Sequence, residues 1–331
     1  MKTLVCISPG HFEYIHKEIP VPAKGHVLIK ISRVGICGTD LHAFKGTQPY
    51  FSYPRILGHE LAGEIEEIDD AAEFKKGDIV AIMPYFFCGN CFPCRHGKIN
   101  CCMQIKVAGV HTDGGFAEYF TAPVNCLLQS QGLTIDEIAL TEPLAIGAHG
   151  INRAQIKKDD FVLIIGAGPI GLALMEFAKL AGGKVLVMDV NEMRLEFCSN
   201  HLGVQIIRSS DELADITNGD LAPVVIDATG NLSAINNGFR YMSHGGRYVL
   251  VGLQKENIVF SHPDFHKKEG TLMSSRNALK QDFENVIHAI KNKKIDPMKY
   301  ITHRVHFDEV KDQFPGWLNR ESNVIKAMVS L

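Results

Sequence analysis

Four cysteines lie close together in the segment CGNCFPCRHGKINCC. They are Cys88, Cys91, Cys94 and Cys102, and their spacing is three, three and eight positions. Four thiolates so close in the chain can complete a tetrahedral shell around one Zn²⁺ and exclude water, which is a structural site. Four unrelated buried or free cysteines are the alternative, but repeated C-x-x-C spacing favours the metal. We do not expect Cys101 to be a ligand.

A second set of metal-binding side chains precedes this segment. Cys37 lies in GICGTDLH, and His59 and Glu60 lie in GHE. Thiolate, imidazole and carboxylate are the ligand types of a catalytic zinc, where three protein groups leave a position for water or substrate. A single cysteine and a single His-Glu pair are often structural, so spacing alone leaves both interpretations open.

A glycine motif follows an apolar stretch in the second half of the chain. The stretch 161–165 leads directly into GAGPIG, and 172–180 has a helical pattern. Between a strand and a helix, G-x-G-x-x-G is typical of a dinucleotide site, because its glycines allow a tight turn, close approach of a pyrophosphate and helix–strand packing. Free N–H groups at the helix start would bind the phosphates. The expected contacts are Gly166, Gly168, Pro169, Ile170 and Gly171.

Asp189 is the residue that predicts which dinucleotide binds. It ends the next apolar stretch, 23 positions after Gly166. A carboxylate there accepts hydrogen bonds from ribose hydroxyls and repels a 2′-phosphate, so we expect NAD rather than NADP. Arg194 could stack on adenine or attract a phosphate. With Asp189 in place, we still expect NAD rather than NADP.

The elements that position these residues differ between the two parts of the chain. The first third has short β-like runs, such as 26–32 and 78–83, between glycine and proline turns. From about residue 144, apolar strands alternate with amphipathic helices, which indicates βαβ units around a parallel sheet. The expected strands are 161–165, 184–189, 223–227, 247–251 and 270–274. A helical pattern over 282–294, a strand over 301–307 and a helix-like stretch over 308–320 complete the chain.

Length and composition narrow the class of protein. A chain of 331 residues predicts two domains, and 46% apolar with 21% charged residues is typical of a globular protein. A net charge of -3 argues against a nucleic-acid partner. The longest apolar run, 161–175, is too short and too rich in glycine to span a membrane, so we expect no membrane partner. Nine cysteines without an export signal favour metal binding in the cytoplasm.

Together, Cys37, GHE, the four-cysteine segment and GAGPIG occur in an order that resembles the zinc-containing medium-chain dehydrogenases, which include alcohol, sorbitol and threonine dehydrogenases. The resemblance covers essentially the whole chain. It implies an α/β protein with a GroES-like β-rich catalytic domain over 1–146, including a structural zinc lobe at about 84–104. It further implies a Rossmann domain with a doubly wound parallel sheet over 147–281, and a segment, 282–331, that returns to the first domain. Two Zn²⁺ ions, NAD and a homo-oligomer, dimer or tetramer, are expected.

The resemblance also assigns roles around the catalytic zinc. Cys37 and His59 are similar to the two invariable ligands, and Asp40 would orient the imidazole of His59. Glu60 resembles a carboxylate that either binds the metal or lies just behind it. Glu142, in TEPLAIGAHG, falls where alcohol dehydrogenases have a third cysteine ligand and polyol dehydrogenases a glutamate, so it should hold zinc directly or through water. A carboxylate that only stabilises a helix N-terminus is the alternative.

The zinc is expected to act as a Lewis acid on a substrate hydroxyl. By the same resemblance, Thr39 and His42 pass the proton outward; without it, both would be interpreted as structural. The ends of later strands should line the nicotinamide pocket, with Val251, Gly252 and Ser275 as its expected members.

The substrate prediction also depends on resemblance. Glu142 and the segments GVHTDGGFAEY and KKEGTLMSSRNALKQDF resemble the bacterial branch that oxidises sugar acids such as L-gulonate or L-galactonate at C5. Lys45, His111 and Arg276 are unranked candidates for binding the substrate carboxylate. A neutral polyol (sorbitol or galactitol) and threonine are the alternative substrates. A catalytically silent relative that binds NAD and zinc is the alternative that is not an enzyme, and the intact set of reactive residues argues against it.

Overall fold

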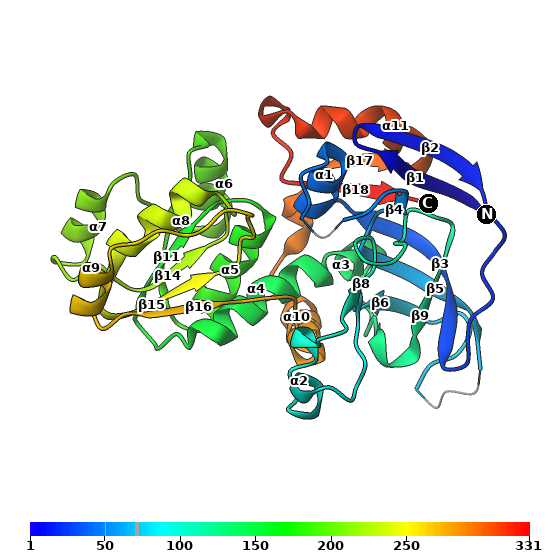
Figure 1. The fold of residues 1–331 in the computed structure, drawn as a ribbon, viewed down its shortest axis with the longest axis horizontal. Coiled ribbons are helices and arrows are strands. Elements are labelled where there is room, and N and C mark those ends of the chain that lie inside the picture. Colours follow the sequence, from blue (N-terminus) through cyan, green and yellow to red (C-terminus); the bar gives the residue numbers. More distant parts are fainter. Residues whose placement is uncertain (50, 70–72) are drawn as a thin grey trace. The chain divides into compact units, whose positions relative to one another are not determined.

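The computed structural model describes residues 1–49, 51–69 and 73–331. The chain divides into two compact units (Figure 1). One contains Met1–Pro143 together with Leu279–Leu331, and the other contains Leu144–Ala278. Each unit is described by itself.

The first unit is built around a seven-stranded sheet with the order β10-β6-β5-β3-β18-β17, to which β9 adds by pairing with β3. The strands are β3 (His26–Gly35), β5 (Glu60–Ile68), β6 (Ile79–Ile82), β9 (Tyr119–Pro123), β10 (Leu127–Gln129), β17 (Ile301–His306) and β18 (Lys326–Ser330). The last strand of the chain, β18, pairs antiparallel with β3, with Met328 opposite Gly35. In Figure 1, the red C-terminal strand accordingly lies beside the blue β3.

A smaller sheet, smaller helices and a lobe complete this unit. The sheet has the order β2-β1-β4. The elements are β1 (Lys2–Ser8), β2 (His11–His16), β4 (Arg55–Ile56), α1 (Gly38–Lys45), α3 (Ile135–Ala139), α10 (Lys280–Lys291), η2 (Val124–Cys126) and η4 (Pro297–Tyr300). The lobe contains β7 (Tyr85–Phe86), α2 (Phe92–Arg95), η1 (Ile99–Cys101) and β8 (Lys106–Val107). Phe12, Phe44 and Phe314 make ring contacts in the core, so the C-terminal segment contributes to the same core as β2 and α1.

The C-terminal segment differs from the prediction of one helix-like stretch over 308–320. It forms short pieces instead: η5 (Phe307–Glu309), α11 (Val310–Gln313), η6 (Phe314–Leu318) and η7 (Arg320–Ser322). Pro315 has no N–H to donate to the carbonyl four residues before it, so the α-helical hydrogen-bond ladder is interrupted there, although Phe314 keeps α-helical backbone angles (φ -56°, ψ -43°). Val310, Phe314 and Trp317 are nevertheless buried. The apolar periodicity therefore reflected burial and not a continuous helix.

The second unit is a six-stranded sheet with the order β13-β12-β11-β14-β15-β16, in which every pair of neighbours is parallel. Its strands are β11 (Phe161–Ile165), β12 (Lys184–Met188), β13 (Gln205–Ile206), β14 (Ala222–Asp227), β15 (Met242–Leu250) and β16 (Thr271–Ser274). Numbered from β11, this is the order 3-2-1-4-5-6 of a doubly wound dinucleotide-binding fold. The predicted parallel α/β sheet is thus confirmed.

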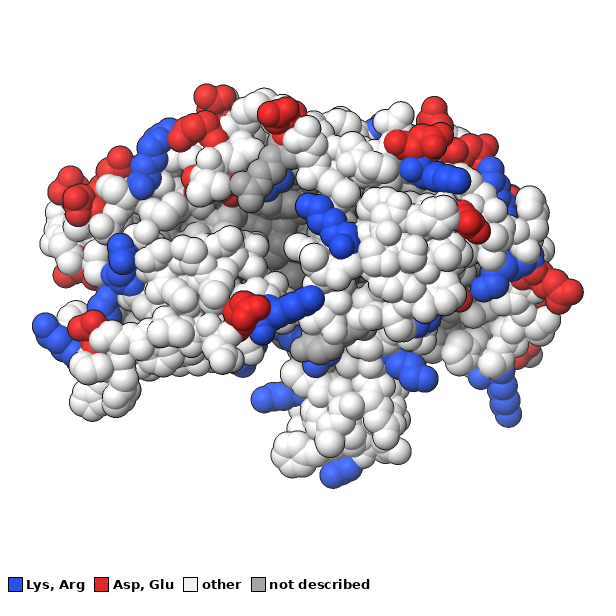
Figure 2. All heavy atoms as spheres, turned by 45° about the horizontal axis from the view of Figure 1, so that its top comes forward, with Lys and Arg blue, Asp and Glu red and all other residues white. Residues whose placement is uncertain are grey.

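One helix leads into the first of these parallel strands, and the others connect the strands and pack around the sheet (Figure 1). They are α4 (Thr141–Ala154), which begins in the first unit, α5 (Pro169–Leu180), α6 (Glu192–Leu202), α7 (Ser210–Ile216), α8 (Leu232–Gly238), η3 (Phe239–Tyr241) and α9 (His262–Lys267). β15 begins five residues before the predicted start at Arg247, because a Gly245-Gly246 pair that resembles a turn lies inside the strand. In the part of the chain that the structure covers, no helix combines the length and apolarity needed to cross a membrane. Basic and acidic side chains are interspersed over the face in Figure 2.

Candidate active site

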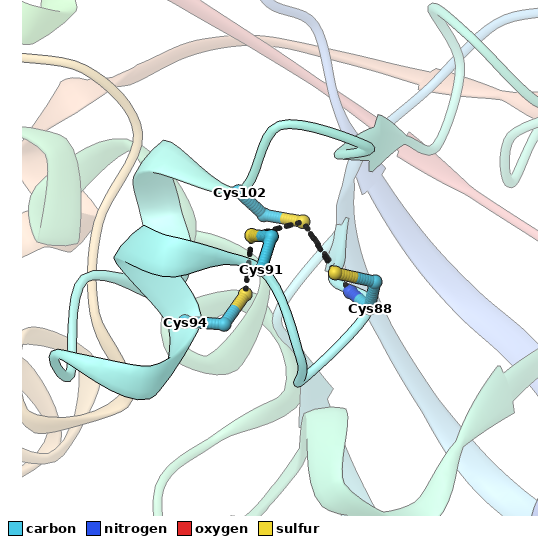
Figure 3. A group of neighbouring side chains, drawn as sticks. All are labelled: Cys88, Cys91, Cys94 and Cys102. Carbon is cyan, nitrogen blue, oxygen red and sulfur yellow. Dashed lines mark hydrogen bonds between the residues drawn. The ribbon is translucent and has the colours of Figure 1, made fainter.

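The four cysteines of the lobe converge on one point (Figure 3). Their sulfur atoms all lie within 4.8 Å of one another. The Sγ–Sγ distances are 3.4 Å for Cys91–Cys94, 3.8 Å for Cys91–Cys102 and 3.5 Å for Cys102–Cys88. Sulfurs at about 2.3 Å from one tetrahedral Zn²⁺ lie about 3.8 Å apart, so the four thiols fit a structural zinc.

The backbone around these sulfurs favours thiolates. The N–H groups of Cys88 and Gln104 donate to Sγ of Cys102 at 3.3 and 3.4 Å. A backbone hydrogen bond from Met103 lowers the pKa of the Cys91 thiol to about 6. Because zinc binds the deprotonated sulfur, these donors assist metal binding.

The N-terminus of α1 brings Cys37 and His59 together. Cys37 caps the helix, and its N–H donates to Oδ2 of Asp40 at 2.9 Å. The N–H of Gly58 donates to Oδ1 of Asp40 at 3.1 Å. The buried carboxylate of Asp40 therefore ties the start of α1 to the loop that carries His59.

The imidazole of His59 is buried among negative groups. Its Nδ1 lies 3.6 Å from Oδ1 of Asp40, which is beyond hydrogen-bond distance, and the ring hydrogen-bonds with the Cys37 side chain. Burial lowers the pKa of His59, but Asp40, Cys37 and Glu142 outweigh burial and raise that pKa well above its usual value. Since the same surroundings that favour a proton on His59 favour any cation, the donor set fits zinc.

Glu60 is held by a residue that sequence reasoning missed. Both of its oxygens accept hydrogen bonds from Nζ of Lys326, at 2.6 and 2.7 Å, and the ammonium also donates to the carbonyl of Ile36 at 3.0 Å. Both side chains are buried, with exposures of 0% for Glu60 and 2% for Lys326. A Cβ atom on Gly35 would lie 2.0 Å from Oε2 of Glu60, so only glycine leaves room for this carboxylate. The sequence did contain one indication of this pair, because Lys326 is the single charged residue in the otherwise apolar stretch IKAMV and a buried lysine needs an acidic partner.

Glu142 has a different kind of partner, which was also missed. The hydroxyl of Tyr85 donates a hydrogen bond to Oε1 of Glu142, and both residues are buried. Burial raises the pKa of Glu142 to about 7, with His59 opposing the shift and Glu60 adding to it. Burial and the Glu142 charge raise the pKa of Tyr85 well above its usual value, so Tyr85 remains a neutral donor.

The remaining predicted reactive residues lie on or near α1. Thr39 is half-buried in the first turn, and His42 is exposed in the last, with its Nδ1 3.0 Å from Oγ1 of Thr47. Cys37, His59 and Glu142 are electrostatic neighbours. Within the described ranges, however, only the four cysteines of the lobe place three or more donor atoms within 4.8 Å of one another.

The three candidates for binding a substrate carboxylate are in different surroundings. Lys45 is exposed at the end of α1, and Arg276 is exposed after β16 in the second unit. Nδ1 of His111 accepts the N–H of Val107 at 3.1 Å. That ring nitrogen is therefore engaged within its own loop.

The glycine motif of the second unit forms the junction of β11 and α5. Gly166 has φ +106°, which favours glycine, and a Cβ on Gly171 would lie 1.9 Å from the carbonyl oxygen of Gly166. Gly168 caps α5, and the nearest atom to a Cβ there is Nη1 of Arg194 at 3.7 Å. The N–H groups of Gly168, Ile170 and Gly171 at the start of α5 suit a pyrophosphate, whereas Pro169 has no N–H and fixes the first turn of the helix.

Asp189 lies directly after β12, and the chain itself fixes its orientation. Its Oδ2 accepts the N–H of Ala167 at 2.6 Å, and its Oδ1 accepts the N–H of Asn191 at 2.8 Å. Each oxygen keeps a further lone pair for a ribose hydroxyl. The carboxylate is thus held beside the glycine motif.

The expected nicotinamide residues follow the carboxyl ends of two other strands of this sheet. Val251 and Gly252 come after β15, and a Cβ on Gly252 would lie 2.1 Å from the N atom of Gly230. Ser275 comes after β16, and its buried Oγ has no hydrogen-bond partner among the residues that the structure describes. The carboxyl ends of parallel strands share one edge, where ligands of such sheets bind.

Comparisons with known proteins agree with this arrangement. Residues 23–132 match the alcohol dehydrogenase GroES-like domain, and residues 169–292 match the zinc-binding dehydrogenase domain. The chain is 43% identical over 336 residues to L-galactonate-5-dehydrogenase of Escherichia coli, covering 100% of this chain and 99% of the relative. It is 32% identical to a sorbitol dehydrogenase of Halalkalibacterium halodurans, covering 93% of this chain and 94% of that protein.

A solved structure supports the same relationship. The alcohol dehydrogenase RspB of Escherichia coli, in complex with NADH, superposes with a TM-score of 0.93 at 32% identity, covering 100% of this chain and 99% of that chain. The predicted GroES-like and Rossmann fold classes are confirmed. The chain belongs to the zinc-containing medium-chain alcohol and polyol dehydrogenases, and it is a zinc- and NAD-dependent alcohol dehydrogenase.

Proposed function

We propose that this enzyme oxidises a secondary alcohol of a sugar acid, at C5 of a substrate of the L-galactonate or L-gulonate class, with NAD. The observation that carries the proposal is the buried carboxylate of Glu142 beside His59 and Cys37. A carboxylate oxygen is a harder ligand than a thiolate and exchanges more readily with hydroxyl groups, which suits a polyhydroxylated substrate. Identity of 43% to L-galactonate-5-dehydrogenase over the full chain supports the sugar-acid class.

We assign the catalytic metal to Cys37, His59 and Glu142. The structural zinc belongs to Cys88, Cys91, Cys94 and Cys102. When bound, the catalytic zinc supplies a Lewis acid for the substrate hydroxyl, and NAD supplies the hydride acceptor. Glu60 stays paired with Lys326 and does not bind the metal, because both of its oxygens already accept hydrogen bonds from that ammonium group. It contributes to the electrostatic field around the metal ligands.

The residues of this chain move the proton and hold the site in place. Asp40 positions the loops of Cys37 and His59 through two backbone N–H groups. Thr39 accepts the proton of the substrate hydroxyl and gives up its own proton, which passes through the ribose of NAD to His42; His42 is exposed in the last turn of α1 and releases the proton to solvent.

The cofactor residues are assigned to the second unit. Asp189 accepts the ribose hydroxyls, which favours NAD over NADP. The other cofactor contacts are Gly166, Gly168, Pro169, Ile170, Gly171, Arg194, Val251, Gly252 and Ser275. The domain limits proposed are 1–146, 147–281 and 282–331.

Two wider properties belong to the same proposal. All nine cysteines lie in the described part of the chain as free thiols, which favours a cytoplasmic location. The edge strand β16 exposes Leu272, which favours a homo-oligomer that covers this edge. The molar mass in solution, from light scattering, tests the oligomer.

The substrate test is NADH formation with L-galactonate, L-gulonate, sorbitol, galactitol and L-threonine, with and without a chelator. The expected result is the highest kcat/KM for a sugar acid, and loss of turnover when the chelator removes zinc. A higher kcat/KM for sorbitol or galactitol would replace the sugar acid by a neutral polyol. Absence of turnover with every substrate, in protein that retains zinc, would indicate a catalytically silent relative.

A further inference from the structure

Tyr85 occupies a fixed and fully enclosed position. It lies in β7, opposite Val107 of β8, at the base of the cysteine lobe. Its side chain is buried, and its ring contacts Phe283 edge-on at a centroid distance of 6.2 Å. Its hydroxyl donates to Oε1 of Glu142. Since backbone pairing and ring packing both fix the phenol, it can determine where the Glu142 carboxylate points.

The two carboxylates of the site are held in chemically different ways. Glu60 is paired with a full positive charge on Lys326, whereas Glu142 receives a hydrogen bond from a neutral hydroxyl. An ammonium compensates the charge of a carboxylate, but a phenol only orients it. The Glu142 carboxylate, whose hydrogen-bond partner is a neutral hydroxyl, is therefore available to a metal ion, whereas the Glu60 carboxylate is already paired with a cation.

We propose that Tyr85 is a positioning residue, which engages Oε1 of Glu142 and leaves Oε2 as the oxygen that binds the catalytic metal. Binding through one oxygen keeps a coordination position free for water or the substrate hydroxyl. If Oε1 were released, it could bind the same metal and occupy that position. The inference rests on the proposed function, because it requires Glu142 to be a ligand.

The lobe adds a structural reason for this role. Tyr85 precedes the first zinc-binding cysteine, Cys88, by three positions, and β7 and β8 bracket the four-cysteine segment. The N–H of Ala108 donates to the carbonyl of Pro84 at 3.0 Å and extends this pairing. The structural zinc lobe thereby fixes the strand from which Tyr85 reaches Glu142.

The test compares Y85F with the wild type and with Y248F. Y85F removes only the hydroxyl, and Y248F is a matched control because the buried hydroxyl of Tyr248 donates to the carbonyl of Ile235 at 3.0 Å in the second unit. Each protein is prepared with zinc in the cysteine lobe and cobalt(II) in the second site. The visible spectrum of cobalt reports the number and type of ligands, independently of turnover.

Y85F is expected to retain both metals, to show the weaker visible bands of a cobalt ion with an added ligand, and to lose kcat about tenfold, or about 1.4 kcal/mol. KM for the substrate and the metal content should change little. Y248F should match the wild type in spectrum and kcat. A Y85F protein with wild-type spectrum and kcat would overturn the role of Tyr85.

E142Q separates this failure from failure of the proposed function. If E142Q changes the cobalt spectrum and Y85F does not, Glu142 is a ligand and only the positioning role is wrong. If E142Q leaves the spectrum unchanged, the ligand assignment itself is wrong. Should Y85F not fold, 3-fluorotyrosine at position 85 keeps the ring and changes the donor strength of the hydroxyl, and an unchanged spectrum then overturns the proposal.

Discussion

Replacing Lys326 by methionine removes the cation of the buried pair with Glu60 and keeps an unbranched side chain of similar length. Lys326 and Glu60 are 2% and 0% exposed, and the ammonium donates three hydrogen bonds, including one to Ile36. The stranded carboxylate cannot move toward β3, because its Oε2 already lies where a Cβ of residue 35 would be. Removing one partner of a buried ion pair lowers the free energy of unfolding by about 3–5 kcal/mol.

The assay is urea unfolding followed by the fluorescence of Trp317, the single tryptophan of the chain, which lies in the core of the first unit. K326M should strongly lower the urea concentration at the midpoint of unfolding. The double variant E60Q/K326M should recover much of the loss, because it no longer buries an unpaired charge, and the double-mutant cycle measures the coupling. K76M, which breaks the exposed pair with Glu66, should leave the midpoint nearly unchanged. Equal midpoints for K326M and K76M would refute the reasoning.

Three further predictions concern the metal and the cofactor. C37S should abolish turnover, whereas its affinity for NADH, measured by fluorescence titration, should stay the same because the glycine motif lies in the other unit. Loss of NADH binding in folded C37S would contradict this assignment of the metal and the cofactor to different units. D189S should narrow the ratio of kcat/KM for NAD over NADP, and an unchanged ratio would mean that Asp189 was misassigned. The free energy of unfolding of the chelated protein should fall as pH rises from about 4.5 to 7. The reason is that the pKa of Glu142 is higher in the folded state than in the unfolded state, so the folded state binds this proton more tightly. The raised pKa of His59 lowers the free energy of unfolding in the same direction. The pKa shift of Glu142 alone corresponds to a change of up to about 3 kcal/mol in the free energy of unfolding over this pH range. E142Q should therefore weaken the dependence of the unfolding free energy on pH, measured by denaturant titrations at several pH values. The same pH dependence in E142Q and the wild type would exclude Glu142 as its source.

Features formed within a short stretch of chain could be predicted from the sequence. The four cysteines occupy fifteen consecutive positions, 88–102, and their sulfurs converge as expected for a structural zinc. The glycine motif lies between a strand and a helix, as predicted, because its turn and packing constraints act over six residues. The strands of the parallel sheet were predictable for the same reason: strands buried on both faces are continuous apolar runs.

Only the tertiary structure decided how the two acidic side chains of the site are held. Glu60 and Lys326 are 266 positions apart, and Glu142 and Tyr85 are 57 apart. No local pattern records such pairs, since each depends on how distant strands align: β18 on β3, and β7 beside the start of α4. The 308–320 segment shows the same limit, because core packing buries its apolar residues without a continuous helix. Residue types and spacing therefore determined which chemical groups are present, whereas long-range pairing determined which carboxylate is neutralised and which remains available to a metal.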